Sequence, residues 1–322
     1  MLQNSIESNA YALHARLAKH NVLRTNIATP SVAWEDDEHA ALENRLLEGR
    51  YLEGLRSSIK SLTPEPINSA DDFIQWFEGL AECGPGQNHM LFDWLERDAN
   101  LDELKWFLTQ EMVGDLGFED LVAYTQIKLP AAAKLECARN FWDEMGRGKQ
   151  GATHSLLLGR VIHGLKLQPS IDTALWESLA RNNVMLGLAT NRRYAYHSLG
   201  ALGASELTSV ARAAKISACM SRLGLEPWIR SYFDLQIALD VSHSRCWVRE
   251  VIRPLIIANP ECAPFIAEGA LMRLQSDQLC FDRYSYELGL NDETILEENE
   301  VLPLFFHGLS SNEANVLNMN AA

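Results

Sequence analysis

The sequence predicts an all-α fold, and three observations support this class. Apolar residues recur at spacings of three and four through most of the chain, as on one face of an α-helix. The alternation of β-branched residues that is typical of strands is nearly absent. With 322 residues and 47% hydrophobic content, the chain is also long and apolar enough to bury a large helical core.

Turn-forming residues divide this helical pattern into segments. The breaks in the first half are Gly84-Pro85-Gly86, Leu129-Pro130 and Gly146-Arg147-Gly148; those in the second half are Pro169, Glu226-Pro227 and Asn259-Pro260. Pro254 is expected to kink or end the helix in which it falls, because proline cannot donate a backbone hydrogen bond. The predicted helices are, in order, 36–60, 71–82, 88–98, 101–127, 130–146, 151–166, 171–200, 205–224, 227–257 and 262–288.

Composition along the chain predicts three regions. Residues 1–70 are polar, with the acidic run Glu35-Asp36-Asp37-Glu38, and are expected to form an accessory helical segment. Residues 71–290 carry the main helical bundle. Residues 291–322 form an acidic tail that we expect to be partly disordered, although its apolar stretch 302–306 can dock on the bundle or on a second subunit in a homodimer.

The charge balance excludes two classes of partner. A formal net charge of −15 makes the average surface repel nucleic-acid phosphates and anionic lipids. No apolar run reaches the length of a spanning helix, and the start MLQNSIESNA lacks the features of a signal peptide. The six cysteines are scattered singly, so we expect them to be reduced and mostly buried. The prediction is a cytoplasmic protein that binds neither nucleic acid nor a membrane.

The sharpest local pattern lies in the segment 232–247. Gln236, Asp240 and His243 stand at i, i+4 and i+7, which places three polar groups on one face of a helix. The intervening Ile237, Leu239 and Val241 are apolar and indicate a buried segment. Buried polar groups must be satisfied by one another or by a metal ion.

Further acidic residues stand in apolar surroundings elsewhere in the chain. Glu144 precedes the glycines of Gly146-Arg147-Gly148, which should end one helix, so that His154 lies in the first turn of the next and both point at one spot. Glu111 and Glu206 are each flanked by apolar residues. Taken singly, Glu111 is readily explained as a surface or ion-paired residue and Glu206 as a charge near a helix N-terminus.

Considered together, these carboxylates favour a metal site. Glu111, Glu144, Glu206 and Asp240 in one bundle would repel one another, and two divalent cations would balance their four charges. Oxygen-rich ligation with some imidazole suits iron or manganese better than zinc.

The segments 89–96, 107–111, 140–154, 199–208 and 232–254 together resemble the haem-oxygenase-like family of iron-containing redox enzymes. The resemblance implies a seven-helix bundle, here with additional N-terminal helices, that binds no haem and holds non-haem Fe(II), two per chain. It further implies an oxidoreductase that uses dioxygen on a small molecule such as an amino acid or a related metabolite, in specialised-metabolite biosynthesis. By this resemblance the metal-ligating and catalytic positions are Glu111, Glu144, His154, Glu206, Asp240 and His243.

One position departs from the family pattern. Gln236 stands where the family usually has a histidine, and an amide oxygen is a weaker ligand than imidazole. A single-iron enzyme and a non-catalytic metal-binding protein therefore stay open. A cofactor-free, thiaminase-like enzyme is a further alternative, with Cys219 or Cys246 as its thiol. Arg192, Arg193 and Arg212 flank Glu206 and are candidates to hold a substrate carboxylate.

Overall fold

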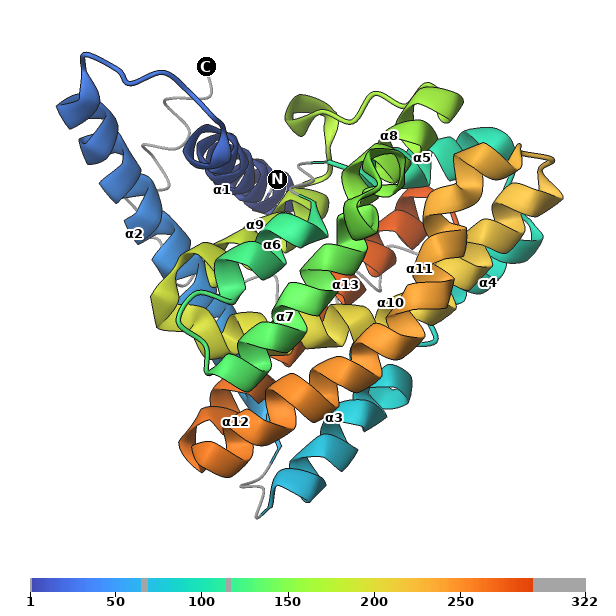
Figure 1. Cartoon of the computed structure of the whole chain (residues 1–322). Helices are drawn as coiled ribbons and strands as arrows, with labels where there is room; N and C mark the ends of the chain where they lie inside the picture. Colours follow the sequence, from blue (N-terminus) through green and yellow to red (C-terminus); the bar gives the residue numbers. More distant parts are fainter. Residues whose placement is uncertain (1, 65–68, 114–116, 292–322) are drawn as a thin grey trace.

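The computed structural model describes residues 2–64, 69–113 and 117–291, and within these ranges every regular element is helical (Figure 1). The predicted all-α class is therefore confirmed. The predicted tail 291–322 lies, apart from its first residue, outside the described residues. The helices are α1 (Leu2–Thr25), α2 (Trp34–Ser58), α3 (Ala70–Cys83), α4 (Met90–Arg97), α5 (Leu101–Glu111), α6 (Phe118–Thr125), α7 (Ala131–Glu144), α8 (His154–Leu165), α9 (Trp176–Thr190), α10 (Ala195–Arg222), α11 (Pro227–Cys246), α12 (Arg253–Ala258) and α13 (Ala263–Glu287).

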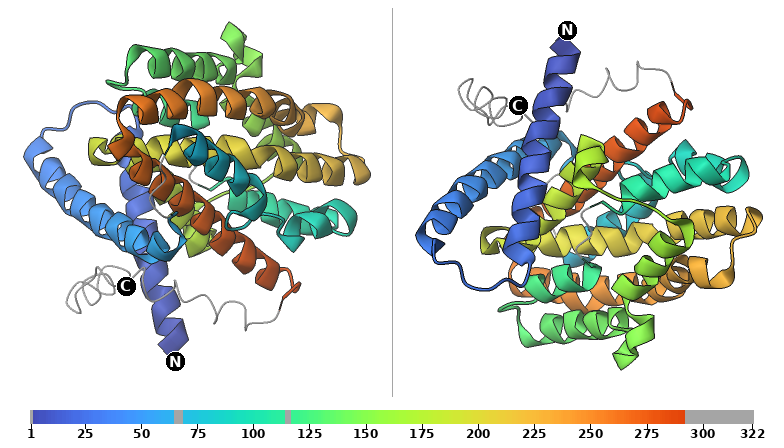
Figure 2. Two further views of the ribbon diagram at one scale, coloured as in Figure 1. Left: turned by 90° about the horizontal axis from the view of Figure 1, so that it is seen from below. Right: turned by 90° about the horizontal axis from the view of Figure 1, so that it is seen from above.

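Helices α10 and α13 cross at the centre of the bundle. A Cβ atom on Gly200 would lie 1.9 Å from the carbonyl oxygen of Ile266, and one on Gly269 would lie 1.9 Å from the carbonyl oxygen of His197. Only glycine permits such a close approach of two backbones. Helix α10 also packs against α3, α4, α9 and α11, and it runs through the middle of both views in Figure 2. This buried helix is the support on which the surrounding helices are placed.

The N-terminal helices α1 and α2 pack against α9 at one side of the bundle (Figures 1 and 2). The His14 ring packs against Tyr51 and Trp176, with ring centroids 4.7 and 5.6 Å away. The Asn21 amide donates a 2.8 Å hydrogen bond to the Asn183 side chain. Helix α1 was not among the predicted helices. The accessory role of residues 1–70 stays a prediction.

Two predicted helices have other boundaries. The predicted helix 101–127 is divided, because α5 ends at Glu111 and α6 begins only at Phe118. The predicted helix 171–200 is also wrong, since α9 ends at Thr190. The Asn191 side chain there accepts a hydrogen bond from the backbone N–H of Arg193 and starts a short 3₁₀ turn. Helix α10 then begins at Ala195 and continues without the predicted break after residue 200.

The chain after α11 winds into a π-helical turn at Trp247–Ile252 before α12 begins. Pro254 lies in the first turn of α12, where its missing N–H costs little. The chain stays helical from this turn into α12, so the expectation that Pro254 kinks or ends its helix remains a prediction. The wider turn also buries Trp247, whose indole donates a 3.0 Å hydrogen bond to the carbonyl oxygen of Leu199 in α10. This contact fixes the C-terminal end of α11 against the central helix.

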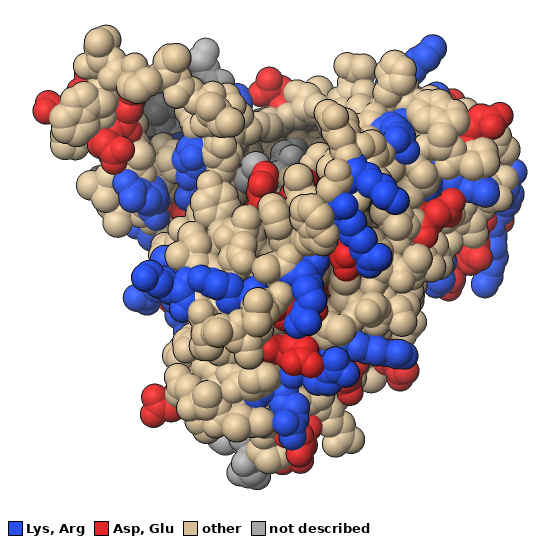
Figure 3. All heavy atoms as spheres, in the orientation of Figure 1, with Lys and Arg blue, Asp and Glu red and all other residues tan. Residues whose placement is uncertain are grey.

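None of the helices in the described part of the chain is both long and apolar enough to cross a membrane. On the face shown in Figure 3, Lys and Arg side chains are intermixed with Asp and Glu rather than gathered into one basic surface.

Candidate metal centre

Five of the predicted ligand positions meet inside the bundle. The glycine turn separates Glu144, the last residue of α7, from His154, the first residue of α8, as predicted. Glu206 comes from the buried part of α10, and Asp240 and His243 come from the inner face of α11. All five side chains are buried. Helices distant in the sequence therefore bring three carboxylates and two imidazoles into one interior site.

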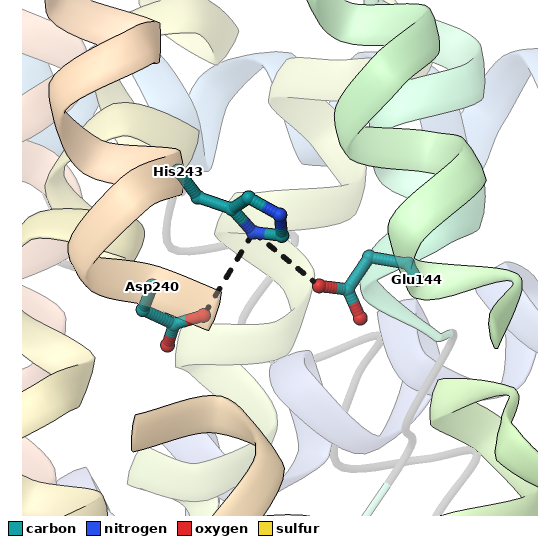
Figure 4. A group of neighbouring side chains, drawn as sticks. All are labelled: Glu144, Asp240 and His243. Carbon is teal, nitrogen blue, oxygen red and sulfur yellow. Dashed lines mark ion pairs between the residues drawn. The ribbon is translucent and has the colours of Figure 1, made fainter. Parts of the chain in front are cut away.

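The His243 ring is surrounded by the three carboxylates. Its Nδ1 atom lies 3.7 Å from Glu144 Oε1, 3.6 Å from Glu206 Oε2 and 3.9 Å from Asp240 Oδ1. Figure 4 shows Glu144 reaching from α7 toward Asp240 and His243 on α11. Ligand atoms from these three residues all lie within 4.8 Å of one another. These separations are longer than direct hydrogen bonds and leave a common point that a small cation can reach.

The donor set fits a divalent metal ion. Neither Asp240 Oδ1 nor His243 Nδ1 has a hydrogen-bond partner within the described structure, although both atoms are buried. Leaving such atoms unsatisfied is unfavourable, and coordination of one cation would satisfy both. Carboxylate oxygens with imidazole nitrogen are a ligand set that iron and manganese accept.

The electrostatics of the site point the same way. Burial, together with the charges of Glu206 and Glu144, raises the pKa of Asp240 to about 8. Burial alone would lower the pKa of His243, but the carboxylates of Glu206, Asp143 and Glu144 raise it to about 10. Protons on these two groups would balance part of the negative charge of the site, and a divalent cation would displace them.

Neighbouring polar groups hold the ligands in place. The Asn140 amide donates a 2.5 Å hydrogen bond to Glu206 Oε1, and the Ser209 hydroxyl donates one of 2.5 Å to Asp240 Oδ2. Asp143 Oδ2 lies 3.2 Å from Nε2 of His243, so it orients the ring with Nδ1 toward the carboxylates. None of these three residues was predicted as a site residue from the sequence. Asp143 could have been recognised, because it stands beside Glu144 at the end of a helix.

His154 forms the second half of the site. Its Nδ1 atom lies 2.8 Å from Glu144 Oε2 and 3.1 Å from Gln236 Nε2, while its Nε2 atom lies 3.3 Å from the Tyr232 hydroxyl. Gln236 is buried on the same face of α11 as Asp240. The amide of Gln236 thus faces the site at the position where the family pattern usually has a histidine.

Glu111 does not join this cluster. It is the last residue of α5, and its Oε1 atom forms a 2.6 Å ion pair with Nη1 of Arg181 in α9. Its side chain stays 26% exposed, whereas that of Glu144 is 3% exposed. Glu111 is thus ion-paired in the structure, and its assignment as a metal ligand stays a prediction.

The other residues considered from the sequence lie in different surroundings. Arg192 donates to the backbone carbonyls of Thr125 and Ile127, and Arg193 pairs with Glu53, so neither faces the cluster. Burial raises the pKa of the Cys219 thiol, which opposes thiolate formation.

A cavity of about 250 Å³ adjoins the cluster. Glu144, His154, Glu206 and Asp240 line it together with Glu111 and Arg212. Apolar side chains, including Phe92, Leu108, Met112, Leu158, Ile216 and Phe281, form much of the remaining wall. A small molecule in this cavity would lie beside the metal-ligating side chains.

Comparison with known proteins agrees with this site. Residues 105–278 match the model of a family described as iron-containing redox enzymes. All of the predicted ligand positions fall within the matched range.

Two crystal structures of a CADD-like protein of unknown function from Nostoc punctiforme are similar in fold. Each is 18% identical to the chain and covers 68% of it, over 95% and 97% of the solved chain, with TM-scores of 0.49 and 0.51. The second of these supports the helical fold and nothing beyond the fold. No curated protein matches the sequence significantly.

Proposed function

Because the chain belongs to the iron-containing redox enzyme family, we propose that it is a non-haem iron oxidase or oxygenase that uses dioxygen to oxidise a small molecule. The observation that carries this proposal is the buried group of Glu144, Asp240 and His243, in which two ligand atoms have no protein partner. The adjoining cavity provides a place for the substrate.

The arrangement of Glu144 supports two iron positions. One of its oxygens faces the His243 ring and the other faces the His154 ring. Glu144 therefore belongs to both of the ligand groups that could hold a metal ion in the interior of a helical bundle. Glu144, Asp240 and His243, with Glu206, would hold the first iron. His154 and Glu144 would hold the second, with only the amide of Gln236 where a further imidazole is usual.

Ferrous iron would supply electrons for the reduction of dioxygen. The protein's own groups have three tasks in this proposal. Asp143 orients the His243 ring, and Asn140 and Ser209 fix the carboxylates of Glu206 and Asp240. The apolar side chains of the cavity wall would bind the apolar part of a substrate and limit the access of water beside it.

The test is an anaerobic titration of the metal-free protein with ferrous iron, followed by exposure to oxygen and stopped-flow absorption spectra. We expect wild type to bind close to two irons and to develop a transient visible absorption band. Glu144→Ala should lose both properties. Glu136→Ala is a matched control, because Glu136 is a buried glutamate on the same helix that pairs with Arg139 instead.

Other outcomes would identify the alternatives. One bound iron with a transient band would indicate a single-iron enzyme, which the weak ligand Gln236 favours. Iron binding without any reaction with oxygen would indicate a non-catalytic metal-binding protein. If wild type binds no iron, or if Glu144→Ala binds it as well as wild type does, the proposal is wrong.

A further inference from the structure

Three arginines converge on one aspartate in the wall of the same cavity. Arg181 from α9, Arg212 from α10 and Arg273 from α13 surround Asp277, and all four residues line the cavity. Their guanidinium nitrogens lie 3.8, 3.1 and 3.1 Å from the Asp277 carboxylate oxygens. We call Arg181, Arg212 and Arg273 the arginine cluster.

The arginine cluster is buried and carries an excess of positive charge. The side chains of Arg181, Arg212 and Arg273 are 5%, 15% and 17% exposed, and that of Asp277 is 1% exposed. Among the described residues, the carboxylates paired with these arginines are those of Asp277 and Glu111. Three positive charges therefore face two negative charges, which leaves a net charge of one.

This excess charge is unfavourable without an additional anion. Burial, with the charges of Arg181 and Arg212 adding to it, lowers the pKa of Arg273 in spite of the neighbouring Asp277. A buried charge is normally compensated by a partner, and a single negative group entering the cavity would restore neutrality. Neutralising Asp277 alone would require one arginine rather than three.

The arginine side chains are held in fixed positions. Arg212 donates a 3.0 Å hydrogen bond to the Thr208 hydroxyl, and its guanidinium lies 5.3 Å from the centroid of the Phe281 ring. Asp277 contacts all three arginines and keeps them together. A preformed group of guanidinium donors matches the two oxygens of a carboxylate.

The cavity connects this cluster to the metal-ligating side chains. Glu144 and Asp240, the arginine cluster, and apolar side chains such as Phe92 and Leu108 all line it. A molecule complementary to this cavity would carry one negative group for the arginine cluster and an apolar body for the apolar side chains.

We propose that the arginine cluster binds the carboxylate of the substrate, and that the substrate is a monoanionic acid whose apolar part extends toward Glu144 and Asp240. This inference rests on the proposed function, because it assigns the substrate class of the same site. The arginine cluster and its two carboxylate partners carry one excess positive charge, which favours a substrate with one negative charge. The arginines position the substrate and take no part in the oxidation itself.

The test measures binding of simple acids to the full-length chain by calorimetry, under anaerobic conditions, with and without ferrous iron. The probes are straight-chain carboxylates of roughly four to ten carbons, each compared with the primary alcohol of equal length. The best carboxylate should bind at least about tenfold more tightly than its alcohol, as expected for charge-assisted hydrogen bonds. This preference should persist without iron, because the anchoring group is the arginine cluster.

Three variants locate the binding site. Arg212→Gln should abolish the preference for the carboxylate, whereas Lys215→Gln should retain it. Lys215 stands on the same helix with the same charge, but it pairs with Asp93 and does not line the cavity. Glu111→Gln should tighten carboxylate binding, because it frees Arg181 from its present partner.

The gain expected for Glu111→Gln keeps the test decisive even if Arg212→Gln does not fold. The inference is overturned if no carboxylate binds more tightly than its alcohol, if the preference survives Arg212→Gln, or if it appears only with iron bound. Failure of the proposed function alone would look different: iron would not bind, while the carboxylate preference would remain.

Discussion

Glu144 is the residue on which the site depends most directly. Its two carboxylate oxygens face two different imidazoles, and it reaches this position because α7 ends where the glycine turn begins. Gly146 adopts a φ of 62°, and a Cβ there would lie 2.6 Å from the carbonyl carbon of Ala152. The turn thus brings His154 back to Glu144 through a conformation that glycine readily adopts.

Gln236 decides how well the second metal position can be filled. It lies one helical turn before Asp240, and its amide contacts His154 instead of offering an imidazole. We predict that Gln236→His will strengthen binding of the second iron by about tenfold or more, because imidazole is the better ligand. Competition titration with a chelator would measure the two binding constants.

A matched variant separates ligation from a change in packing. Gln236→Leu keeps a buried side chain of similar size without a ligand atom, and it should bind the second iron no better than wild type does. The interpretation of Gln236 fails if the His and Leu variants give the same second binding constant.

Glu111 shows where residue-level reasoning from sequence reaches its limit. Its apolar neighbours made it resemble the other buried carboxylates, but its ion-pair partner, Arg181, stands 70 residues away. The helical spacing of Asp240 and His243, in contrast, is local, and it could be read directly from the chain. Tertiary partners of a charged residue are not encoded in the residues beside it.

At the scale of the elements, the crossing of α10 and α13 supports Glu206 and Asp277 together. We predict that Gly200→Ala or Gly269→Ala will destabilise the protein by about 2–3 kcal/mol or more, because the added Cβ would meet a backbone carbonyl that cannot move freely. Urea unfolding followed by circular dichroism would measure the free energy of unfolding.

Gly79 provides the control for this prediction. It lies within α3, and a Cβ there would meet no atom within 4 Å. Gly79→Ala should therefore stabilise the protein by roughly 0.5–1 kcal/mol through helix propensity. Equal effects at Gly79 and Gly200 would show that the close crossing does not limit substitution.

Helix α1 gives the protein a specific sensitivity to acid. Burial lowers the pKa of His14 to about 3 from its usual 6.5, so the ring stays neutral in the folded chain. The unfolded chain takes up this proton below the usual pKa, and stability is consequently lost as the pH falls from 6.5 toward 3. Between pH 7.5 and 5.5, His14 should account for a loss of about 1 kcal/mol.

Comparison with His14→Phe isolates this contribution. Phenylalanine can still pack against Tyr51 and Trp176 but cannot bind a proton. Urea unfolding at both pH values should show a smaller loss of stability for the variant than for wild type. An identical pH dependence of the two proteins would exclude His14 as the source.

At the scale of the whole molecule, the metal site joins helices from distant parts of the chain. Glu144, Glu206 and His243 come from α7, α10 and α11, so a bound cation would link all three in the folded state only. At a concentration about 100 times its Kd, Mn(II), which we choose because it does not consume oxygen, should stabilise the protein by about 2.7 kcal/mol. We predict a corresponding rise in Tm of roughly 4 °C.

The same measurement on His243→Ala serves as the reference. This variant lacks the imidazole that faces all three carboxylates, and its Tm should change little when Mn(II) is added. If Mn(II) raises the Tm of both proteins equally, the ion binds elsewhere on this acidic chain.

The whole molecule also brings together two groups that the sequence keeps apart. The metal-ligating side chains and the arginine cluster line one cavity. Arg181 and Arg273 nevertheless stand 92 positions apart in the chain and on different helices. Arg212 was considered from the sequence as a substrate-binding residue, and only the fold supplies its two companions.

Four features could be predicted from the sequence: the helical class, the approximate position of most helices, the family, and two local pairs of candidate ligand positions, Glu144 with His154 and Asp240 with His243. These features depend on spacing within a few turns, and helical periodicity and glycine turns encode that spacing locally. Three other features were not predictable from the sequence: α9 ends at Thr190, Glu111 pairs with Arg181, and three arginines line the cavity. Such features depend on contacts between residues far apart in the chain, which exist only once the helices have packed.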